Sequence, residues 1–470
     1  MNKAPGKIYN SLTRKTENLP KRTGGPLRLF VCGLTVYDTP HIGNARTYLA
    51  FDAFVKYLRA QGIAVEYLQN ITDIDDKILR RAKEEGLSWK VIARRYTANY
   101  KKILKALNID SVDTYAPATS YIKEIEEQVK GLEDKGFVYK IDGDGYYFNI
   151  KRFKEYGKLA GRTAFQAEDA TTRIDDSIKK KNKGDFCVWK FSLKSEAGWK
   201  SSLGFGRPGW HIEDTAIAFK FLGSQYEIHG GGIDLKFPHH EAEIAQAEAL
   251  SGKKPYVKLW MHTGHLQVEG QKMSKSLKNF ITADDFLKKY EGNVLRLMVL
   301  SHHYRSPLNY TFEGAQGYGK SWKTIEDLFS KLDFINKTKP VKPANDLEYT
   351  DSLTETRKKF HEALGNDFNT PAALGEFHKL LGWVQPKLWQ MSSKEALRWK
   401  KELTFWFDSL GFKINTIKIP AKIKTLVTKR DKAREMHDYK LSDELRDKIS
   451  DLGYRVDDTP RGQYTGRKLD

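Results

Sequence analysis

Apolar residues follow two different spacings in the first seventy positions. Residues 27–33 (LRLFVCG) form a short apolar run closed by a glycine, which is typical of a buried strand. Residues 64–70 (AVEYLQN) predict a second strand. Between them, a helical spacing of i, i+3, i+4 and i+7 ends near Gly62, and its apolar members are Phe51, Phe54, Val55 and Leu58. This β-loop-α-β order is typical of a parallel nucleotide-binding sheet, with its chemistry at the carboxyl ends of the strands, where Cys32 and Asn70 stand.

Helices and then an insertion are expected after the second strand. The pattern predicts helices over about 73–85 and 88–106. Residues 119–200 are mixed, and we interpret them as an insertion within the first domain. Within it, 138–150 (VYKIDGDGYYFNI) predicts a hairpin because DGDG is a turn signal, and the lysine-rich stretch 179–185 predicts a solvated loop.

The second half of the chain shifts from strand to helix. Residues 226–237 (YEIHGGGIDLKF) predict a later strand and glycine turn of the same sheet. From Thr282, a candidate N-cap, the pattern is helical. A linker over 337–346 precedes another helical region. The last fifty residues form a unit of their own, with a helix over about 420–437 and a second helix for which Ser442 is the expected N-cap.

The net charge of the chain indicates which classes of partner it can bind. The 470 residues include 80 Lys and Arg against 60 Asp and Glu, a formal charge of +20. This favours an anionic partner such as nucleic acid, although a lysine-rich surface gives the same excess. No apolar run approaches the roughly 18–20 residues of a membrane helix, and residues 1–22 lack the apolar stretch of a secretory signal. Two cysteines exclude a disulfide scaffold and fit a reducing compartment, so we expect a cytoplasmic protein.

Two short motifs suggest phosphate chemistry. His41-Ile42-Gly43-Asn44 precedes the predicted helix, whose N-terminus offers unpaired N–H groups to phosphate. Lys272-Met273-Ser274-Lys275-Ser276 carries two ammonium groups that can neutralise charge on a pyrophosphate leaving group. Alone, the first motif is more often a loop histidine, and the second a solvated loop.

Taken together, the two motifs resemble the HIGH and KMSKS signatures of class I aminoacyl-tRNA synthetases. Many further segments resemble the cysteinyl-tRNA synthetase family, in the family's order: VCGLTVYDTPHIGNARTYLAFD, NITDIDDKI, YGKLAGR, DFCVWK, GRPGWHIE, HGGGIDLKFPHHEAEIAQAEA, HTGHLQVEGQKMSKSLKNF, LRLMVLSHHYRSPLNY and LVTKRDKAREMHDYKLSDELRDKISDLGYRVDDTPRG. The resemblance begins at KIYNSLTRK and covers essentially the whole chain, so we expect no transit peptide.

The resemblance implies an α/β fold: a class I Rossmann-type parallel-sheet catalytic domain with an insertion, followed by all-α tRNA-binding domains. The expected boundaries are 1–118 and 204–263 for the halves of the catalytic domain, 119–203 for the insertion, 264–336 for the KMSKS loop and stem-contact region, 345–413 for an anticodon-binding bundle and 420–470 for a small C-terminal domain.

The activity implied is ATP-dependent formation of cysteinyl-adenylate and transfer of cysteine to tRNA(Cys). The expected partners are L-cysteine, ATP with Mg²⁺, and tRNA(Cys), without a membrane, and the chain is expected to be a monomer, as most family members are. Two alternatives remain open. A paralogue would transfer cysteine to a small amine, as the mycothiol-pathway ligase does, and a catalytically dead homologue would only bind RNA.

The resemblance also assigns site residues. His41, Asn44, Lys272 and Lys275 are the expected catalytic residues, although the family often has a second histidine where this chain has Asn44. Thr72 and Trp210 are expected to contact cysteine. The residues expected to bind ATP are Thr35, His41, Gly43, Asn44, His229, Gly230, Gly231, Gly232, Asp234, Met273, Ser274 and Lys275.

A zinc site is implied at Cys32, Asp214, His239 and Glu243. His239 and Glu243 are four residues apart on a predicted helix and so share a face. The family carries a cysteine where this chain has Asp214. Aspartate can bind zinc through oxygen, but it can also hydrogen-bond nearby while three residues and solvent hold the metal, and a chain without zinc is a third alternative. A pocket wall distinguishes such close analogues as cysteine and serine by only about 1–3 kcal/mol. A zinc–thiolate bond would add the missing selectivity, so we expect no editing domain.

Overall fold

The computed structural model describes residues 6–21, 24–161, 177–273, 277, 279–339, 346–415 and 417–469. The chain divides into two compact units, one of Met1–Lys289 with Tyr304–Asn309 and the other of Tyr290–His303 with Tyr310–Asp470. None of the helices in the described ranges is long and apolar enough to cross a lipid bilayer.

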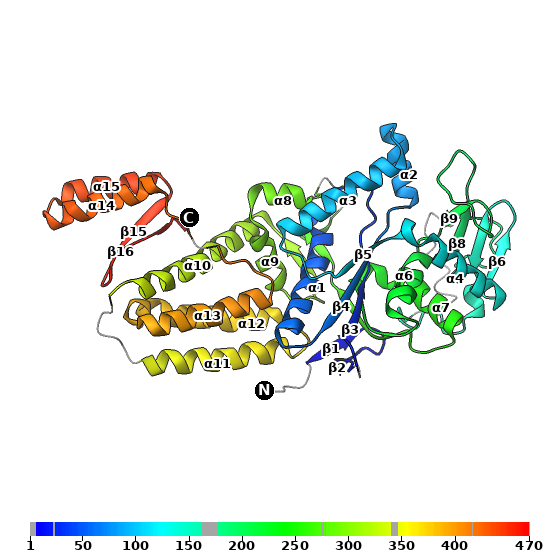
Figure 1. Cartoon of the computed structure of the whole chain (residues 1–470), viewed down its shortest axis with the longest axis horizontal. Helices are drawn as coiled ribbons and strands as arrows, with labels where there is room; N and C mark the ends of the chain where they lie inside the picture. The colour runs from blue at the N-terminus through cyan, green and yellow to red at the C-terminus, as the bar shows by residue number, and fades with distance from the viewer. Residues whose placement is uncertain are drawn as a thin grey trace. The chain divides into compact units, whose positions relative to one another are not determined.

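A five-stranded parallel sheet lies at the centre of the first unit, in the order β11-β10-β3-β4-β5 (Figure 1). Its strands are β3 (Leu27–Val31), β4 (Val65–Ile71), β5 (Thr114–Pro117), β10 (Tyr226–Gly232) and β11 (Val257–Thr263). The three predicted strands of the sheet are thus confirmed. The glycines of β10 belong to the strand itself, which corrects the prediction of a glycine turn there.

Helices cover both faces of this sheet, with α1 on one side and α6 and α7 on the other (Figure 1). The helices of the first unit are α1 (Ile42–Ala60), α2 (Asp76–Glu85), α3 (Trp89–Ala106), α4 (Ile122–Asp134), α6 (Ile212–Leu222), α7 (His239–Ser251) and α8 (Ala283–Lys289). Asp75 caps α2, and the predicted cap of α8 is confirmed because Thr282 Oγ1 accepts from the Asp285 N–H at 3.0 Å.

The inserted region adds an antiparallel sheet to the first unit. Its strands, in the order β6-β7-β8-β9, are β6 (Val138–Ile141), β7 (Gly145–Phe148), β8 (Phe186–Phe191) and β9 (Gly206–Pro208). The predicted hairpin is the pair β6–β7, and the lysine-rich stretch is a loop, as expected. Cys187 is buried in β8 beside Ile141 and Tyr147, as a core thiol.

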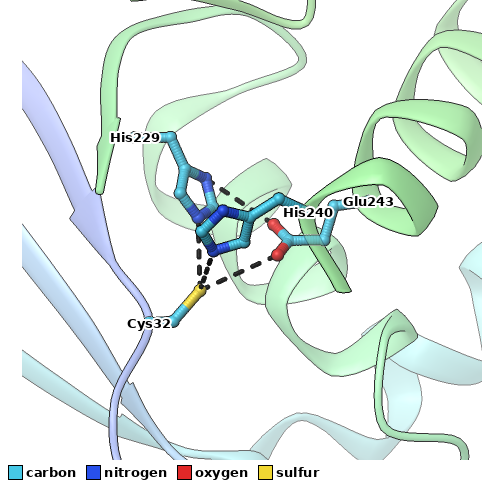
Figure 2. A group of neighbouring side chains, drawn as sticks. All are labelled: Cys32, His229, His240 and Glu243. Carbon is cyan, nitrogen blue, oxygen red and sulfur yellow. Dashed lines mark hydrogen bonds and ion pairs between the residues drawn. The ribbon is translucent and has the colours of Figure 1, made fainter. Parts of the chain in front are cut away.

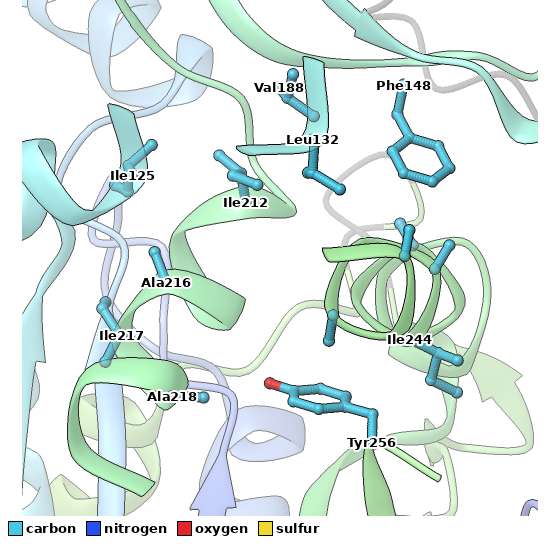
Figure 3. Packing of buried hydrophobic residues seen from close by; sticks show 14 of the residues in the cluster. Ile125, Leu132, Phe148, Val188, Ile212, Ala216, Ile217, Ala218, Ile244 and Tyr256 are labelled. Carbon is cyan, nitrogen blue, oxygen red and sulfur yellow. The ribbon is translucent and has the colours of Figure 1, made fainter. Parts of the chain in front are cut away.

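One apolar core joins this insertion to helices α6 and α7. It contains Ile125 and Leu132 from α4, Val188 from β8, Ile217 from α6 and Ile244 from α7, all fully buried (Figure 3). Burying each such side chain stabilises the fold by about 1.5–3 kcal/mol. The core therefore fixes α6 and α7 against the sheet, and these two helices carry three of the predicted metal ligands.

Shorter elements complete the first unit. β1 (Lys7–Asn10) pairs with β2 (Lys15–Asn18), and β12 (Leu266–Val268) lies between β13 (Gln271–Lys272) and β14 (Leu308–Tyr310).

A helical bundle forms most of the second unit (Figure 1). Its helices are α9 (Gly292–Leu300), α10 (Phe312–Lys337), α11 (Asp346–Leu364), α12 (Thr370–Val384) and α13 (Ser393–Ser409). Three tryptophans with almost no exposed surface, Trp322, Trp399 and Trp406, pack inside it. The sequence 337–346, predicted as a linker, includes 340–345, which lie outside the described residues.

The C-terminal region has two helices, α14 (Ala421–Glu435) and α15 (Tyr439–Asp451), followed by a hairpin of β15 (Tyr454–Thr459) and β16 (Gly462–Arg467). The expectation of purely helical domains after the catalytic domain is therefore wrong here. The expected cap of α15 is also wrong: Asp438 caps it by accepting from the Leu441 N–H at 3.0 Å, and Ser442 lies inside the first turn. Both residue types cap helices well, and the chain uses the earlier one.

A buried arginine ties α1 to the loops around the sheet's carboxyl edge. Arg46 is 1% exposed, and its guanidinium donates to the carbonyls of Gly264 at 2.8 Å, His265 at 2.5 Å, Tyr304 at 3.3 Å and Ser306. Burial lowers the pKa of Arg46 to about 10, so it remains charged at neutral pH. The forked N–H groups of the guanidinium can donate to several carbonyl oxygens at once, and the ammonium group of a lysine cannot reach the same set.

We expect Arg46→Lys to loosen the segment 264–268, because four carbonyls lose a charged donor, and hydrogen bonds to charged groups contribute about 1.5–3 kcal/mol each. Amide hydrogen exchange there should rise at least about tenfold, since about 1.4 kcal/mol corresponds to a factor of ten. The matched control is Arg59→Lys, also on α1, whose partners are Ser111, Val65 and Asp113. Unchanged exchange at 264–268 in Arg46→Lys would contradict this role.

A second prediction concerns pH. Burial, helped by the carboxylate of Glu291, raises the pKa of Glu326 on α10 to about 7. The folded state then holds this proton more tightly than the unfolded state, so the stabilisation is present below about pH 4.5 and is lost as pH rises through 7. Glu326→Gln should therefore gain about 1–3 kcal/mol over wild type at pH 8.5 but little at pH 4.5, as measured by urea unfolding. Exposed Glu313→Gln on the same helix is the control, and an equal gain at both pH values would refute the assignment.

Candidate active site

A cavity of about 590 Å³ opens at the carboxyl ends of the central strands, where the strand order places a ligand site. Most predicted site residues line it: Cys32, Thr35, His41, Gly43, Asn44, Thr72, Trp210, Asp214, Gly232, Asp234, His239, Lys272 and Met273. Residues far apart in the sequence thus share one cavity. Ser274 and Lys275 lie outside the described residues.

His41 and Asn44 cap helix α1 at the wall of this cavity. His41 Nδ1 accepts from the Asn44 N–H at 3.1 Å, and Asn44 Oδ1 accepts from the His41 N–H at 3.2 Å, a reciprocal capping box. Burial lowers the pKa of His41 to about 4, so the ring is neutral at pH 7. Because Nδ1 accepts, the proton of the neutral ring is on Nε2, which can donate. Asn44, the departure from the HIGH pattern, therefore keeps a structural role at the helix start.

The glycines of β10 make close contacts with protein rings. A Cβ on Gly230 would lie 2.2 Å from the Phe51 ring, and one on Gly231 would lie 2.9 Å from the His240 ring. Neither glycine lines the cavity, nor does His229, whereas Gly232 and Asp234 do. Gly230 faces α1 and Gly231 faces α7 on the other side of the sheet, and the nucleotide contacts expected of His229, Gly230 and Gly231 stay a prediction.

Cys32 follows β3 and is buried among imidazoles and carboxylates. Its Sγ lies 3.2 Å from His229 Nε2, 3.1 Å from His240 Nε2 and 3.7 Å from Glu243 Oε1 (Figure 2). The parallel register pairs His229 with Phe30, two residues before Cys32, so the two side chains share a face of the sheet. Burial, then the nearby carboxylates of Glu243 and Asp214, raise the pKa of the Cys32 thiol well above its usual range.

Helices α6 and α7 bring Asp214, His239 and Glu243 to the same place. His239 Nε2 lies 3.0 Å from Asp214 Oδ2 and 3.2 Å from Glu243 Oε1, which confirms the predicted shared face of His239 and Glu243. The other oxygen of Asp214 accepts a hydrogen bond from the Asn70 side chain. The Trp210 ring stacks on His239 with centroids 4.5 Å apart.

Thr72 is held at the cavity by a second carboxylate. Its hydroxyl donates to Glu213, which is buried and also accepts from Asn70 Nδ2 at 3.3 Å. Burial, then the neighbouring Asp214, raise the pKa of Glu213 well above its usual range. Thr35 is placed beside Thr72 by a parallel bridge between the two residues.

These donors fit a metal ion. The ligand atoms of Cys32, Asp214, His239 and Glu243 all lie within 4.8 Å of one another, and so do those of Cys32, His229, His240 and Glu243. All of these residues are buried, and Glu243 Oε2 has no hydrogen-bond partner. Burial, then Asp214, raise the pKa of Glu243 well above its usual range. A dication would neutralise this group of buried acids, and mixed S, N and O ligands suit zinc.

A layer of histidines surrounds the donors, and most of it was missed from the sequence. His211 Nδ1 lies 2.8 Å from His239 Nδ1, and His240 Nδ1 lies 2.9 Å from His262 Nε2. Burial lowers the pKa of His211, His240 and His229 well below the usual range. Five of the chain's 12 histidines lie together here. Only the fold brings these five together.

The KMSKS segment borders the cavity as far as it is described. Lys272 is exposed on β13, and Met273 Cε would lie 3.4 Å from a Cβ on Gly43, so this segment approaches the start of α1. Phe280, after the segment, packs edge-on against His41 with ring centroids 5.3 Å apart.

The sequence of the chain is similar to those of known proteins and protein families. Residues 19–317 match the family described as tRNA synthetases class I (C) catalytic domain, and residues 359–415 match the DALR domain. The chain is 39% identical to a cysteine–tRNA ligase of Persephonella marina, over 98% of this chain and 99% of that protein. It is also 39% identical to a cysteine–tRNA ligase of Thermococcus onnurineus, over 97% and 98% of the two chains.

Solved structures share the fold at low identity. The methionyl-tRNA synthetase of Mycobacterium tuberculosis, in complex with methionyl-adenylate, matches with a TM-score of 0.58 at 16% identity, over 82% of this chain and 89% of that one. LeuRS of Agrobacterium radiobacter, in a ternary complex, matches with a TM-score of 0.60 at 11% identity, over 83% and 85%. The family matches and the two relatives together show that this chain belongs to the family of class I cysteine–tRNA ligases.

Proposed function

We propose that this chain activates L-cysteine with ATP to cysteinyl-adenylate and transfers the cysteine to tRNA(Cys). The observation that carries the proposal is the buried set of Cys32, Asp214, His239 and Glu243 at a cavity whose other wall is the capped start of α1. A metal-binding group beside a phosphate-binding helix start suits a substrate that has a thiol and must react with ATP.

The metal would be zinc, held by Cys32, His239 and Glu243 with Asp214 as the fourth ligand. Zinc bound there would coordinate the thiolate of cysteine and so prefer it to the hydroxyl of serine. Asp214 supports this role because its Oδ2 points toward His239, although its hydrogen bond to Asn70 is the arrangement expected if it only orients the others. Trp210 and Thr72 would line the remainder of the cysteine pocket.

The nucleotide would lie along the start of α1. The neutral His41 would donate from Nε2 to a phosphate oxygen, and Gly43 would let the phosphates approach the backbone N–H groups. Thr35, Asn44, Gly232 and Met273 would border the nucleotide, and exposed Asp234 would accept from the ribose hydroxyls.

The reaction would be in-line attack of the cysteine carboxylate on the α-phosphorus of ATP, which breaks the bond to pyrophosphate. The chain's residues would orient the two substrates and stabilise charge, without a covalent enzyme intermediate. Lys272 and Lys275 would neutralise the leaving pyrophosphate, with Mg²⁺ bound to ATP. Ser274 would contact the same phosphates.

The regions after the cavity would bind the tRNA. The helical bundle at 345–413 would contact the anticodon, residues 264–336 the stem and residues 420–470 a further part of the tRNA, with 119–203 inserted between the catalytic halves at 1–118 and 204–263. The charge of +20 fits a surface that follows a phosphate backbone. A monomer in the cytoplasm is the state we propose.

The central test is charging of total tRNA with cysteine and with serine, together with metal analysis of the same sample. We expect charging with cysteine to exceed charging with serine by well above about 200-fold, which is the most that a pocket wall alone can achieve. Chelation of the metal should abolish this preference. Cys32→Ser should lose both metal and charging, whereas Cys187→Ser, the only other cysteine, should keep both. Serine activation within 200-fold of cysteine would refute the proposal, and ATP–pyrophosphate exchange without tRNA charging would indicate a small-amine acceptor instead.

The leaving-group role of Lys275 has its own test. Lys275→Ala should lower kcat for adenylate formation by about 10²–10³, because the lost charge acts where charge develops in the transition state. The KM for ATP should change by only a few fold. Lys278→Ala, three residues further along, is the matched control. A rise in KM at constant kcat would instead assign Lys275 to ground-state binding.

A further inference from the structure

Two sets of metal donors overlap at Cys32. The outer set consists of Cys32, Glu243, Asp214 and His239. Both Asp214 and His239 line the cavity. The inner set consists of Cys32, Glu243, His229 and His240 (Figure 2). Neither His229 nor His240 lines the cavity. All four residues of the inner set are buried.

The distances from Cys32 to the other three residues of the inner set are close to those of a tetrahedral zinc site. With Zn–S near 2.3 Å and Zn–N near 2.0–2.1 Å, tetrahedral geometry separates sulfur from nitrogen or oxygen by about 3.6 Å. The Cys32 Sγ lies 3.2 Å from His229 Nε2, 3.1 Å from His240 Nε2 and 3.7 Å from Glu243 Oε1. Shifts of about half an ångström would therefore seat an ion among them.

The far nitrogen of each inner histidine is held by another side chain. The Tyr226 hydroxyl lies 2.6 Å from His229 Nδ1, and His262 Nε2 lies 2.9 Å from His240 Nδ1. His262 is in turn held by Ser11 Oγ at 2.8 Å from its Nδ1. Metal-binding histidines are usually oriented in this way, with the second nitrogen hydrogen-bonded and the first directed at the metal.

Glu243 supplies an independent indication. Its Oε2 is buried without a hydrogen-bond partner, and the nearest imidazole nitrogen, His229 Nδ1, is 3.6 Å away. Its Oε1 lies between the two sets, 3.7 Å from Cys32 Sγ and 3.2 Å from His239 Nε2. One carboxylate can therefore serve either set without moving far.

The residue at position 214 weakens the outer set relative to the inner one. The outer set offers one sulfur, one nitrogen and two carboxylates, whereas the inner set offers one sulfur, two nitrogens and one carboxylate. Zinc is borderline-soft and binds imidazole nitrogen well. A hard carboxylate in place of a softer ligand therefore lowers the zinc affinity of the outer set relative to that of the inner set.

We propose that His229 and His240, with Cys32 and Glu243, form a second binding position for a single zinc ion, alternative to the position that faces the cavity. The inference rests on the metal of the proposed function. Its four protein ligands are those of a structural zinc site, and His229 and His240, unlike Asp214 and His239, do not line the cavity. An ion held there is retained by the protein but is not presented to a substrate in the cavity.

The test measures zinc per chain, by elemental analysis after gel filtration, in His239→Gln, His240→Gln and the double variant. We expect about one zinc in wild type and in each single variant, and less than about 0.2 in the double variant. His437→Gln, an exposed histidine of the second unit, is the control and should hold as much zinc as wild type. Asp214→Asn is a second variant that removes only an outer ligand, and circular dichroism checks that each variant is folded.

Cobalt substitution identifies the position without relying on activity. Each single variant loaded with Co²⁺ should keep a thiolate-to-cobalt charge-transfer band from Cys32, with different ligand-field bands in His239→Gln and His240→Gln. Loss of metal in folded His239→Gln or Asp214→Asn, or two ions per wild-type chain, would overturn the inference. A metal-free wild type that does not charge tRNA with cysteine would instead refute the proposed function.

Discussion

Three buried acidic groups meet at the end of β3, and the arrangement of the first unit depends on keeping them together. Cys32, Asp214 and Glu243 come from a strand end and two different helices, and the imidazoles beside Cys32 are held neutral by burial. Ionising all three acids in this environment is costly unless a cation is present. The raised pKa values of Cys32 and Glu243 express that cost.

Two structural devices shape the cavity. The apolar core that includes Ile125, Ile217 and Ile244 fixes α6 and α7 against the insertion, and so places Asp214 and Glu243. On the opposite side of the sheet, Arg46 ties α1 to the carbonyls that follow β11 and to residues 304–306. The candidate metal ligands and the start of α1 therefore face the same cavity through separate supports.

The metal position also bears on selectivity. An ion held by the outer set would lie beside the cavity, because Asp214 and His239 line it, and a substrate thiol could approach the ion there. A stronger inner set would hold the ion more securely but would reduce its contact with substrate. Under our proposal, the carboxylate of Asp214 would shift the balance between retaining the ion and presenting it to substrate.

Local patterns in the sequence were enough for several features. Periodicity predicted β3, α1 and β4, because strand and helix spacings are properties of neighbouring residues. Spacing placed His239 and Glu243 on one helix face for the same reason. The resemblance to a known family supplied Asp214, Trp210 and Thr72, which no local pattern connects.

Only the tertiary structure decided which histidines reach Cys32 and what the glycines of β10 contact. His229 faces Cys32 because the register of β10 against β3 puts the two side chains on one face, and His240 arrives there because α7 docks beside that strand. Gly230 and Gly231 admit the rings of Phe51 and His240, contacts that depend on how α1 and α7 pack. Sequence by itself determined β3, α1, β4 and the shared face of His239 and Glu243, because these follow from short-range geometry. The set of donors that meets at one point depends on strand order and helix docking, which long-range burial of apolar surface selects.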